Sequence, residues 1–513
     1  MLKQTEVLVI GSGLAGLIAA ITAADNGRQV ILINKTDTLT SGSTYWAQGG
    51  IIFRGNEDDK NKLMEDIIVA GDGACWQPAV EQLVELGPDL VKEILIDKFN
   101  VKFDQSQGTL DLTEEGAHSV RRIIHSKDHT GKAISESIAP FAQKHKNITI
   151  LNNHTAIDLL TLSHHSTNPL DLYEKPACFG AFIMNNATSE VFPIFANNTI
   201  LATGGLGQIY INTTNPAEST GDGYAMAYRA GARLLNMHYI QFHPTTVYGA
   251  HERFLISESV RGEGGILVNK YNQRFMSKYH PQMELAPRDI VARSIYNEML
   301  ETGSPYVYLD VRHLDKDWIV SRFPSINKYL NSIDIDMTRE KIPVVPAEHY
   351  SCGGVGVSLR GRTSLQRLYA VGEVACTGVH GANRLASTSL LEALTWGWVA
   401  GNAVSEVTKE DEYFPNIFDW EDGSEEIDNA LIAQDWLNIK NTMWNYVGLV
   451  RTKARMHRAQ TIFRHLSSEI EDFYRKAKMS KEIIQLRNGV TTAYAVTNFA
   501  IEDRTNRGSH YIK

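Results

Sequence analysis

Three glycines near the start of the chain have the spacing that lets a backbone wrap around a diphosphate. Gly11, Gly13 and Gly16 form the pattern G-x-G-x-x-G, between the apolar residues 7–10 and the apolar residues 17–23. The first glycine permits a tight turn, the second lets the backbone approach a pyrophosphate, and the third lets a helix pack on a strand. Free N–H groups at the helix N-terminus attract the phosphates. This strand–turn–helix context predicts a dinucleotide site and disfavours an ordinary glycine-rich turn.

The next predicted strand, residues 30–33, departs from the usual fingerprint at its end. An acidic side chain is expected there to bind the adenosine ribose, but this chain has Asn34 followed by Lys35. Asparagine can still hydrogen-bond a hydroxyl group. The glycine-rich segments 204–207 and 353–356 do not have the spacing of a second fingerprint. An enzyme that binds two dinucleotides is therefore disfavoured.

Two further segments have compositions that suit a ligand site. Residues 41–50 combine hydroxyl groups, glycines and two aromatic rings, which lets backbone pass close to a flat ligand. A plain surface loop is the alternative for this segment. Residues 111–122 carry carboxylates, an imidazole and two guanidiniums, and a solvated charged loop explains that composition equally well.

A histidine and an arginine stand out because of their local context. Pro244 follows His243 and disfavours a place inside a helix, so a loop position is expected for this histidine. Arg288 is expected at the N-terminus of a helix, where a cation gains nothing from the helix dipole. That local conflict indicates a functional role. The alternative is a surface ion pair between Arg288 and Asp289 or Glu284.

Composition and charge limit the class of protein. The chain has 513 residues, 43% of them hydrophobic, and a net charge of −9, which favours two or three domains and argues against nucleic acid or an anionic membrane as the main partner. The four cysteines are scattered without a C-x-x-C pair, so neither a metal site nor a disulfide framework is expected. The first strand begins within a few residues of the start and no apolar run reaches the length of a membrane span, so we expect a cytoplasmic protein without a signal peptide.

Helical patterns divide the rest of the chain. A helix is predicted to open at residues 221–223, and another begins in the last part of the stretch 380–393, with a serine or threonine as its cap. Residues 409–426 are acidic and mixed, which is typical of a linker. From about residue 427 to residue 485 the pattern is helical and strongly charged, and it predicts a separate helical domain.

Together these blocks resemble the succinate dehydrogenase/fumarate reductase flavoprotein family, and the resemblance continues to residues 504–510. It implies FAD as cofactor and an α/β fold: a Rossmann-like FAD-binding domain with an inserted α+β capping domain and a C-terminal helical domain. The implied boundaries are 1–235 and 346–405 for the FAD-binding domain, 236–345 for the capping domain, 406–426 for the linker and 427–513 for the helical domain.

The resemblance also assigns residues to sites. The FAD contacts fall on Gly11, Ser12, Gly13, Leu14, Ala15, Gly16, Asn34, Lys35, Ser43, Thr44, Tyr45, Trp46, Ala47, Gln48, Gly49, Gly50, Asp222, Glu373, Ser389 and Leu390. The dicarboxylate site falls on Gln241, His243, Ser257, Glu258, His349 and Arg384. Arg288 falls on the residue taken as proton donor or acceptor, so the catalytic set is Arg288, His243, His349 and Arg384.

Two features resemble the branch of the family that oxidises L-aspartate to iminoaspartate, the first step of quinolinate and NAD biosynthesis. Ser43 stands where the respiratory members carry the histidine that is joined to FAD, so non-covalent FAD is expected. Glu115, in a loop similar to that branch, is expected to face the substrate ammonium. Residues 443–448 also resemble that branch. Oxygen or fumarate would accept the electrons, and quinolinate synthase is a transient partner expected from the pathway.

The chemistry of aspartate fits these assignments. Arg384 and Arg288 offer planar, bidentate contacts to carboxylates, while Glu115 distinguishes aspartate from succinate. An arginine is a poor free base, so Arg288 is expected to act mainly through its charge in aspartate oxidation and as a proton relay in fumarate reduction. Two alternatives remain open: a soluble fumarate reductase or succinate dehydrogenase flavoprotein, and a non-catalytic FAD-binding scaffold.

Overall fold

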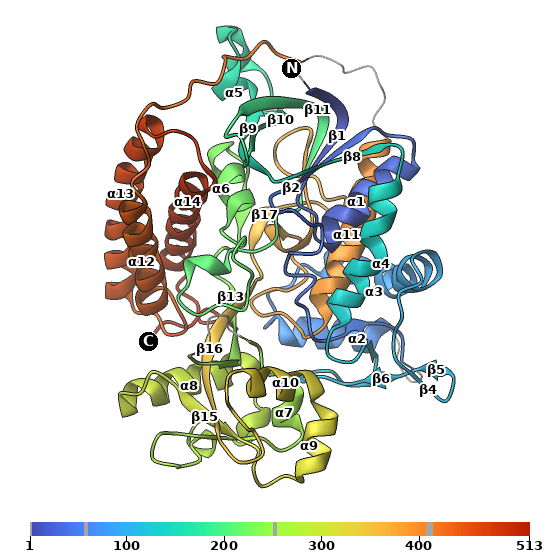
Figure 1. Cartoon of the computed structure of the whole chain (residues 1–513), viewed down its shortest axis with the longest axis vertical. Helices are drawn as coiled ribbons and strands as arrows, with labels where there is room; N and C mark the ends of the chain where they lie inside the picture. Colours follow the sequence, from blue (N-terminus) through green and yellow to red (C-terminus); the bar gives the residue numbers. More distant parts are fainter. Residues whose placement is uncertain (1–2, 56–59, 250–253, 407–413) are drawn as a thin grey trace.

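A mostly parallel sheet forms the centre of the computed structural model, which describes residues 3–55, 60–249, 254–406 and 414–513 (Figure 1). The strand order is β8-β2-β1-β11-β10-β9, with β18 also paired to β11. β1, β2, β8, β11 and β18 run parallel, whereas β9 and β10 are antiparallel to their neighbours. The strands are β1 (Lys3–Ile10), β2 (Val30–Asn34), β8 (Ile148–Asn152), β9 (His154–Thr161), β10 (Cys178–Asn185), β11 (Val191–Leu201) and β18 (Leu368–Ala370).

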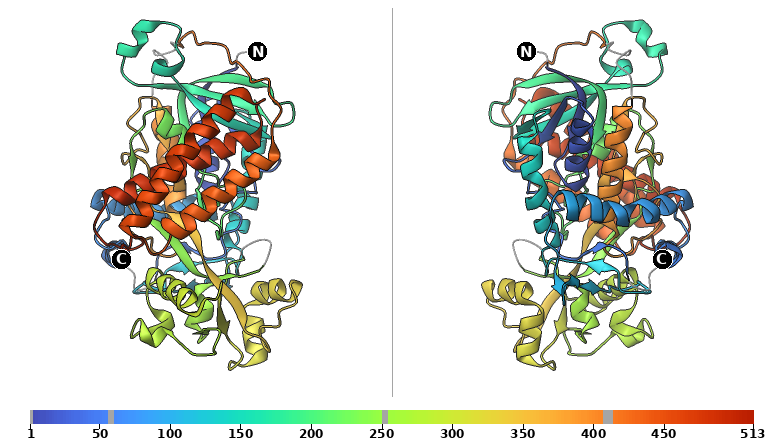
Figure 2. Two further views of the ribbon diagram at one scale, coloured as in Figure 1. Left: turned by 90° about the vertical axis from the view of Figure 1, so that its left-hand side faces the viewer. Right: turned by 90° about the vertical axis from the view of Figure 1, so that its right-hand side faces the viewer.

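Helices cover one face of this sheet, and its central strands are buried. Every residue of β2 is buried, as expected for a parallel strand between two layers. The helices are α1 (Leu14–Asp25), α2 (Lys60–Ala70), α3 (Gln77–Leu90), α4 (Thr130–Lys144) and α11 (Thr388–Ser405), and α1, α3, α4 and α11 lie side by side (Figure 2, right). Gly397 of α11 packs directly on α1, because a Cβ there would lie 2.7 Å from the carbonyl oxygen of Ala15.

A second, antiparallel sheet lies at the lower end of the molecule in Figure 1. Its order is β13-β16-β15-β14, and β13 and β16 extend from it toward the main body. The elements of this capping region are β13 (Ile240–Val247), α7 (Glu258–Gly262), β14 (Ile266–Val268), η4 (Met276–Lys278), η5 (Met283–Leu285), α8 (Arg288–Thr302), β15 (Val307–Asp310), α9 (Lys316–Arg322), α10 (Pro324–Ser332) and β16 (Ile342–Ser351).

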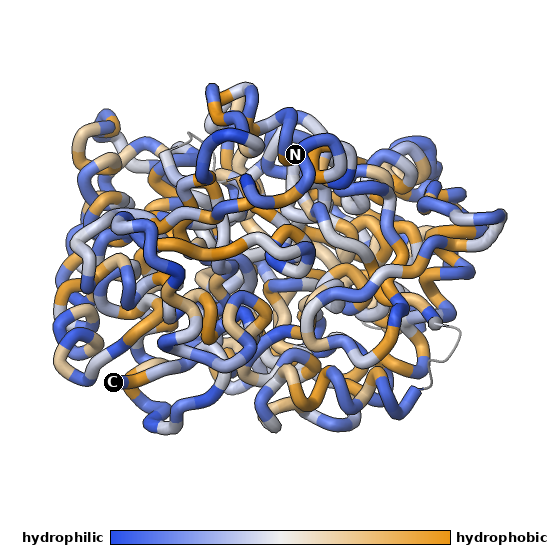
Figure 3. Tube along the Cα trace, turned by 90° about the horizontal axis from the view of Figure 1, so that it is seen from below, coloured by the Kyte–Doolittle hydropathy of each residue, from blue (hydrophilic) through white to orange (hydrophobic). Residues whose placement is uncertain are grey.

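Three long helices pack along one side of the main body: α12 (Asn429–Tyr446), α13 (Lys453–Lys476) and α14 (Lys481–Glu502). Asp428, Thr452 and Ser480 cap their N-termini with side-chain hydrogen bonds. α13 buries one stripe of apolar side chains, and the alternation of polar and apolar residues along these outer helices is visible from below (Figure 3). The helical region thus extends to residue 502, beyond the predicted end near 485.

Short elements complete the fold. They are β3 (Ile51–Ile52), η1 (Val91–Lys98), β4 (Gln105–Ser106), β5 (Thr109–Leu110), β6 (Leu112–Thr113), β7 (Ile123–Ile124), α5 (Leu162–His165), η2 (Pro169–Tyr173), η3 (Gly207–Ile209), α6 (Asp222–Arg229), β12 (Leu234–Leu235), β17 (Gly354–Gly356), η6 (Gly372–Val374) and β19 (Ala375–Cys376). Among the described helices, none is long and apolar enough to cross a membrane.

The structure corrects two local predictions. His243 lies in strand β13 rather than in a loop, because the β13–β16 register shifts between His243 and Thr246 and leaves Pro244 where no ladder donor is needed. The predicted side-chain cap of α11 is absent, since Ser387 has a positive φ of 57° and makes no cap bond. Of the expected linker 406–426, residues 407–413 lie outside the described residues; in the described part, Ile417 bridges Ser166 and Glu425 bridges Ala477 between α13 and α14.

Candidate active site

The β1–α1 turn forms a cradle in which Gly11 and Gly16 cannot be replaced without a clash. A Cβ on Gly11 would lie 2.1 Å from the carbonyl oxygen of Ala202, and one on Gly16 would lie 2.0 Å from that of Gly11. Gly13 precedes α1 and offers no side-chain cap, and the first turn of α1 has no acidic residue. The helix N-terminus is therefore left for an anionic group, which fits the diphosphate of FAD.

Asn34 and Lys35 bind other parts of the protein at the end of β2. The Asn34 Oδ1 accepts a hydrogen bond from the Ser12 hydroxyl at 2.9 Å, and its amide donates to backbone carbonyls of the same turn. Lys35 Nζ donates to Asp222 Oδ2 at 2.7 Å. Burial alone would raise the pKa of Asp222, but Lys35 holds that pKa below its usual value. Four predicted cofactor residues thus contact one another in two pairs, Ser12 with Asn34 and Lys35 with Asp222.

The predicted flavin segment 41–50 is only partly buried. The Trp46 side chain is 57% exposed, so its ring points away from the interior. Gly49 faces the acidic loop, because a Cβ there would lie 3.1 Å from Glu115 Oε1. Glu373 accepts a hydrogen bond from the Ser351 N–H at 3.0 Å, and burial raises the pKa of Glu373 to about 7.

Arg288 is paired with a carboxylate at the start of α8. Its Nε donates a short hydrogen bond to Glu258 Oε2, and Arg261 Nη2 lies 3.7 Å from the other oxygen of Glu258. Burial alone would raise the pKa of Glu258, but the charges of Arg288 and Arg261 hold it below its usual value. The alternative of a surface ion pair is wrong, since Asp289 pairs with Arg293 and Glu284 pairs with Arg274.

Ser257 serves this cluster by beginning α7. Its Oγ accepts a hydrogen bond from the N–H of Ser259, which places Glu258 as the first residue of the helix. Glu258 is thereby aimed from the capping region toward Arg288. The structure gives Ser257 the role of a helix cap.

His243 and His349 face each other from strands β13 and β16, with ring centroids 5.5 Å apart. The Nδ1 of His243 accepts a hydrogen bond from the Thr245 N–H at 3.2 Å, so the neutral ring carries its proton on Nε2. The Nδ1 of His349 lies 2.8 Å from the Thr214 hydroxyl. Burial first, and then nearby arginine charges, lower the pKa of both histidines well below the usual value. Both rings are therefore neutral hydrogen-bonding groups near neutral pH.

Arg384 has a different environment from Arg288. Its side chain donates from Nη1 to the Ser389 hydroxyl at 3.0 Å, and its guanidinium lies over the Tyr350 ring at 4.5 Å. Among the residues that the structure describes, no carboxylate forms an ion pair with Arg384. Gln241 donates from Nε2 to the Arg384 carbonyl at 2.9 Å, so Gln241 positions the arginine from behind. A buried arginine without a counter-ion is suited to an anionic ligand.

Glu115 lies in a loop that is fixed to the main body. Its Oε2 accepts a hydrogen bond from the Ser387 hydroxyl at 2.8 Å. Behind it, the fully buried Arg122 pairs with Asp66 at 2.5 Å, and His118 Nε2 lies 3.0 Å from the Ala386 carbonyl. The segment 111–122 is therefore an ordered wall and not a solvated loop.

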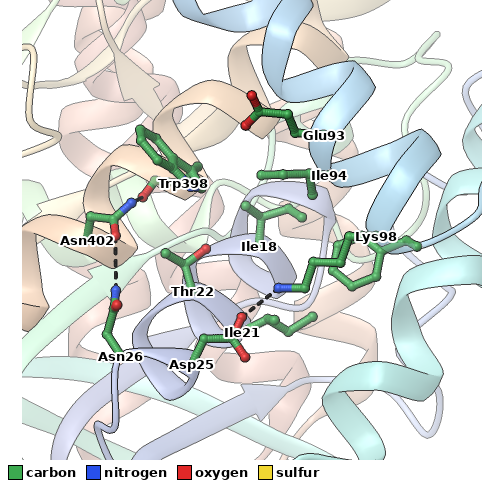
Figure 4. A pocket seen from close by; sticks show the side chains of 11 residues that line it. Ile18, Ile21, Thr22, Asp25, Asn26, Glu93, Ile94, Lys98, Trp398 and Asn402 are labelled. Atoms are coloured by element: carbon green, nitrogen blue, oxygen red, sulfur yellow. Dashed lines mark hydrogen bonds and ion pairs between the residues drawn. The ribbon is translucent and has the colours of Figure 1, made fainter.

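A cavity of about 510 Å³ is lined by some of these groups, whereas its lining residues do not include Glu115, Gln241, His243, Ser257 or His349. Its wall includes Glu258, Arg288 and Arg384 together with Gly116, which follows Glu115, and the C-terminal segment 506–511 closes another side. A second cavity of about 310 Å³ lies between α1, η1 and α11 (Figure 4). Asp25 pairs there with Lys98, and no predicted site residue lines it.

The sequence did not indicate several residues that shape the site. Tyr350, Ser387, His380 and Glu392 contact site residues or one another through long-range interactions, and no spacing rule connects them. In the sequence, Arg122 was noted only as one of the charged residues of the polar segment 111–122.

Comparisons with known proteins agree with this geometry. A family described as the FAD binding domain matches residues 6–390. L-aspartate oxidase from Yersinia pestis is 40% identical over 99% of this chain and 95% of its own, and L-aspartate oxidase 1 from Ralstonia nicotianae is 41% identical over 99% and 94%. A quinol fumarate reductase structure from E. coli is 26% identical, covers 100% of this chain and 92% of its own, and has a TM-score of 0.86.

These similarities confirm the predicted fold class and FAD as the cofactor. They extend over nearly the whole chain, including the capping region and the C-terminal helices. The chain belongs to the L-aspartate oxidase family of FAD-dependent oxidoreductases.

Proposed function

We propose that this chain oxidises L-aspartate to iminoaspartate, with oxygen or fumarate as the final electron acceptor. The observation that carries the proposal is the charge pattern around one cavity: Arg288 and Arg384 line it, and Glu115 directly precedes Gly116, which also lines it. Aspartate has two carboxylates for the arginines and an ammonium for the glutamate. This reaction is the first step of quinolinate and NAD biosynthesis.

The chain's own residues bind and orient the substrate. Arg384 and Arg288 bind the carboxylates, and the neutral His243 and His349 donate hydrogen bonds without adding charge. Glu115 attracts the ammonium and sets the Cα–H bond against the cofactor site. FAD, held by the β1–α1 turn and the segment 41–50, supplies the two-electron acceptor.

Arg288 acts mainly through its charge in this direction. Burial would lower its pKa, but Glu258 and Glu115 raise that pKa above the usual value, so Arg288 does not serve as a free base. In the fumarate-reducing direction, the Glu258 contact lets Arg288 return a proton to the product carbon. The capping region brings both residues to the site, and its closure would exclude water.

Anaerobic mixing of FAD-loaded protein with L-aspartate, and separately with succinate, tests the proposal. We expect L-aspartate to bleach the flavin absorbance, and succinate to shift the spectrum on binding without bleaching it. Bleaching by succinate alone would support the second candidate, a soluble fumarate reductase or succinate dehydrogenase flavoprotein, which the fold similarity to fumarate reductase favours. Bleaching by neither compound would support the remaining alternative, a non-catalytic FAD-binding scaffold.

Glu115→Gln separates the first two candidates. The loss of the carboxylate should reduce kcat/KM for L-aspartate by about tenfold or more, since a charge-assisted contact to the ammonium is lost. Fumarate reduction by the same variant should change much less, because fumarate has no amine. Equal losses in both reactions would contradict the ammonium contact.

Further assignments belong to the same proposal. We keep the domain boundaries 1–235 with 346–405, 236–345, 406–426 and 427–513. With Ser43 in the flavin segment we propose non-covalent FAD, so acid precipitation should release all flavin into the supernatant.

The four unpaired cysteines support a cytoplasmic location. A pull-down with quinolinate synthase tests the transient partnership, which would protect the unstable imine.

A further inference from the structure

We propose that Tyr350 is a positioning residue for Arg384, and that Glu392 and His380 fix Tyr350 in that role. The Tyr350 ring orients the Arg384 guanidinium toward a substrate carboxylate. This inference rests on the proposed function, because it takes Arg384 as a group that binds a carboxylate of the substrate.

Arg384 depends on few contacts for its orientation. The residue is 5% exposed, its Nη1 donates to the Ser389 hydroxyl, and its buried Nε has no partner among the described residues. The guanidinium also contacts the Tyr350 ring, whose centroid lies 4.5 Å from the Arg384 Cζ. An aromatic face attracts a cation without using its N–H groups, so the edge of the guanidinium stays available for a carboxylate.

Tyr350 is itself fixed from behind by a buried carboxylate. Its hydroxyl donates to Glu392 Oε2 at 2.8 Å, and the same oxygen lies 2.8 Å from His380 Nε2. The Thr377 hydroxyl donates to the other oxygen of Glu392, which is 1% exposed on α11. The His380 ring meets the Tyr350 ring edge to face at 5.2 Å. The orientation of the Tyr350 ring is therefore determined by α11 and the loop before it.

The ladder between β13 and β16 places a second contact on the same arginine. Tyr350 pairs with Gln241 in this ladder, so the two side chains lie on one face of the strands. Gln241 Nε2 donates to the Arg384 carbonyl, and Tyr350 lies against the Arg384 guanidinium. One cross-strand pair thus fixes both the backbone and the side chain of Arg384.

A double-mutant cycle on FAD-loaded protein tests the inference. Succinate is the probe, and its dissociation constant is measured from the perturbation of the flavin absorbance. Tyr350→Leu should weaken succinate binding about tenfold, the range of a desolvated cation–π contact. In an Arg384→Met background the same change should have an effect of less than about twofold, because the partner is gone. Full additivity of the two losses would overturn the inference.

A matched control separates positioning from packing. Tyr474 is also buried and lies under an arginine, with Arg487 Cζ 4.1 Å from its ring, but it belongs to α13. Tyr474→Leu should lower the melting temperature and leave the succinate dissociation constant unchanged. FAD content is measured for every variant, and a loss of FAD in Tyr350→Leu in place of a loss of succinate affinity would contradict the inference.

If Tyr350→Leu does not fold, two milder variants test the positioning role of Tyr350. Tyr350→Phe keeps the ring but loses its anchor, and Glu392→Gln weakens the same anchor, so each should weaken succinate binding about threefold. Wild-type affinity in both would overturn the inference while the proposed function stands. An unchanged affinity in Arg384→Met would instead contradict the proposed dicarboxylate site and the inference together.

Discussion

Arg288 and Arg384 line the same cavity, yet the protein stabilises them in opposite ways. Arg288 comes from the capping region and is neutralised by the carboxylate of Glu258. Arg384 comes from the main body and rests on an aromatic ring and a hydroxyl group. An arginine that is paired with a carboxylate of the protein gains little stabilisation from an anionic ligand, whereas a buried arginine without such a partner gains much from binding one.

The difference suggests a division of labour between the two regions. In the part of the chain that the structure describes, no carboxylate forms an ion pair with Arg384, so we expect this region to supply most of the affinity for a dicarboxylate. The Arg288 region has its own counter-ion, so we expect it to hold a fixed charge near the reacting carbon when the capping region closes. Substituting a residue that contacts Arg288 should therefore have different consequences from substituting a residue that contacts Arg384.

The largest effect is expected for Glu258→Gln. This change leaves Arg288 and Arg261 without the carboxylate that faces both of them, and removing one partner of a buried ion pair costs about 3 kcal/mol or more. We expect a lower free energy of unfolding and a kcat lowered by at least about tenfold. Chemical denaturation and steady-state kinetics measure the two quantities. Full stability with full turnover would show that Arg288 does not need its counter-ion.

Arg384→Met should act on binding more than on folding. Loss of a guanidinium that contacts a carboxylate costs about 2–5 kcal/mol of binding free energy, while the folded protein no longer has to bury an unpaired cation. We therefore expect a large rise in KM for L-aspartate with little loss of thermal stability. Arg54→Met, at an exposed surface pair with Asp89, is the control that should leave KM unchanged. A KM within threefold of the wild-type value would contradict the proposed division of labour between the two regions.

The features that were predictable from the sequence depend on contacts close along the chain. The cradle of Gly11, Gly13 and Gly16 was predicted from its spacing and its strand–turn–helix context. Arg288 was predicted at a helix start, where the conflict of a cation with the helix dipole indicated a functional role. The family resemblance added Arg384 and Glu115. None of these steps needs a long-range contact to be known.

Other features could not be predicted, because their causes lie far apart in the sequence. His243 was assigned to a loop from the proline beside it, but a register shift against β16 lets the strand continue. Ser387 was expected to cap α11, but its hydroxyl donates to Glu115 across 272 residues. Glu392 reaches Tyr350 across 42 residues. Local propensity carries no information about such pairings.

The two arginines also predict how stability depends on pH. His243 and His349 have pKa values well below the usual value, because of burial and then of the nearby arginines. The unfolded chain binds protons at about pH 6.5 and the native protein does not, so stability falls as pH drops through that value. We expect a lower melting temperature at about pH 5.5 than at about pH 7.5. Arg384→Met should reduce this difference; a melting temperature that rises on acidification would contradict the neutral histidine pair.

The smallest effect is expected for Ser389→Ala, which tests how much of the Arg384 orientation depends on its one side-chain hydrogen bond. The Ser389 hydroxyl accepts from Arg384 Nη1 at 3.0 Å, and a bond of this kind contributes about 1 kcal/mol. KM for L-aspartate should rise about fivefold, and kcat should stay near the wild-type value because the Arg288 region is untouched. Thr395→Ala, which removes a hydroxyl on the same helix far from the cavity, is the matched control. A fall in kcat without a change in KM would place Ser389 with the cofactor and not with Arg384, and the Tyr350 ring would then be the main support of that arginine.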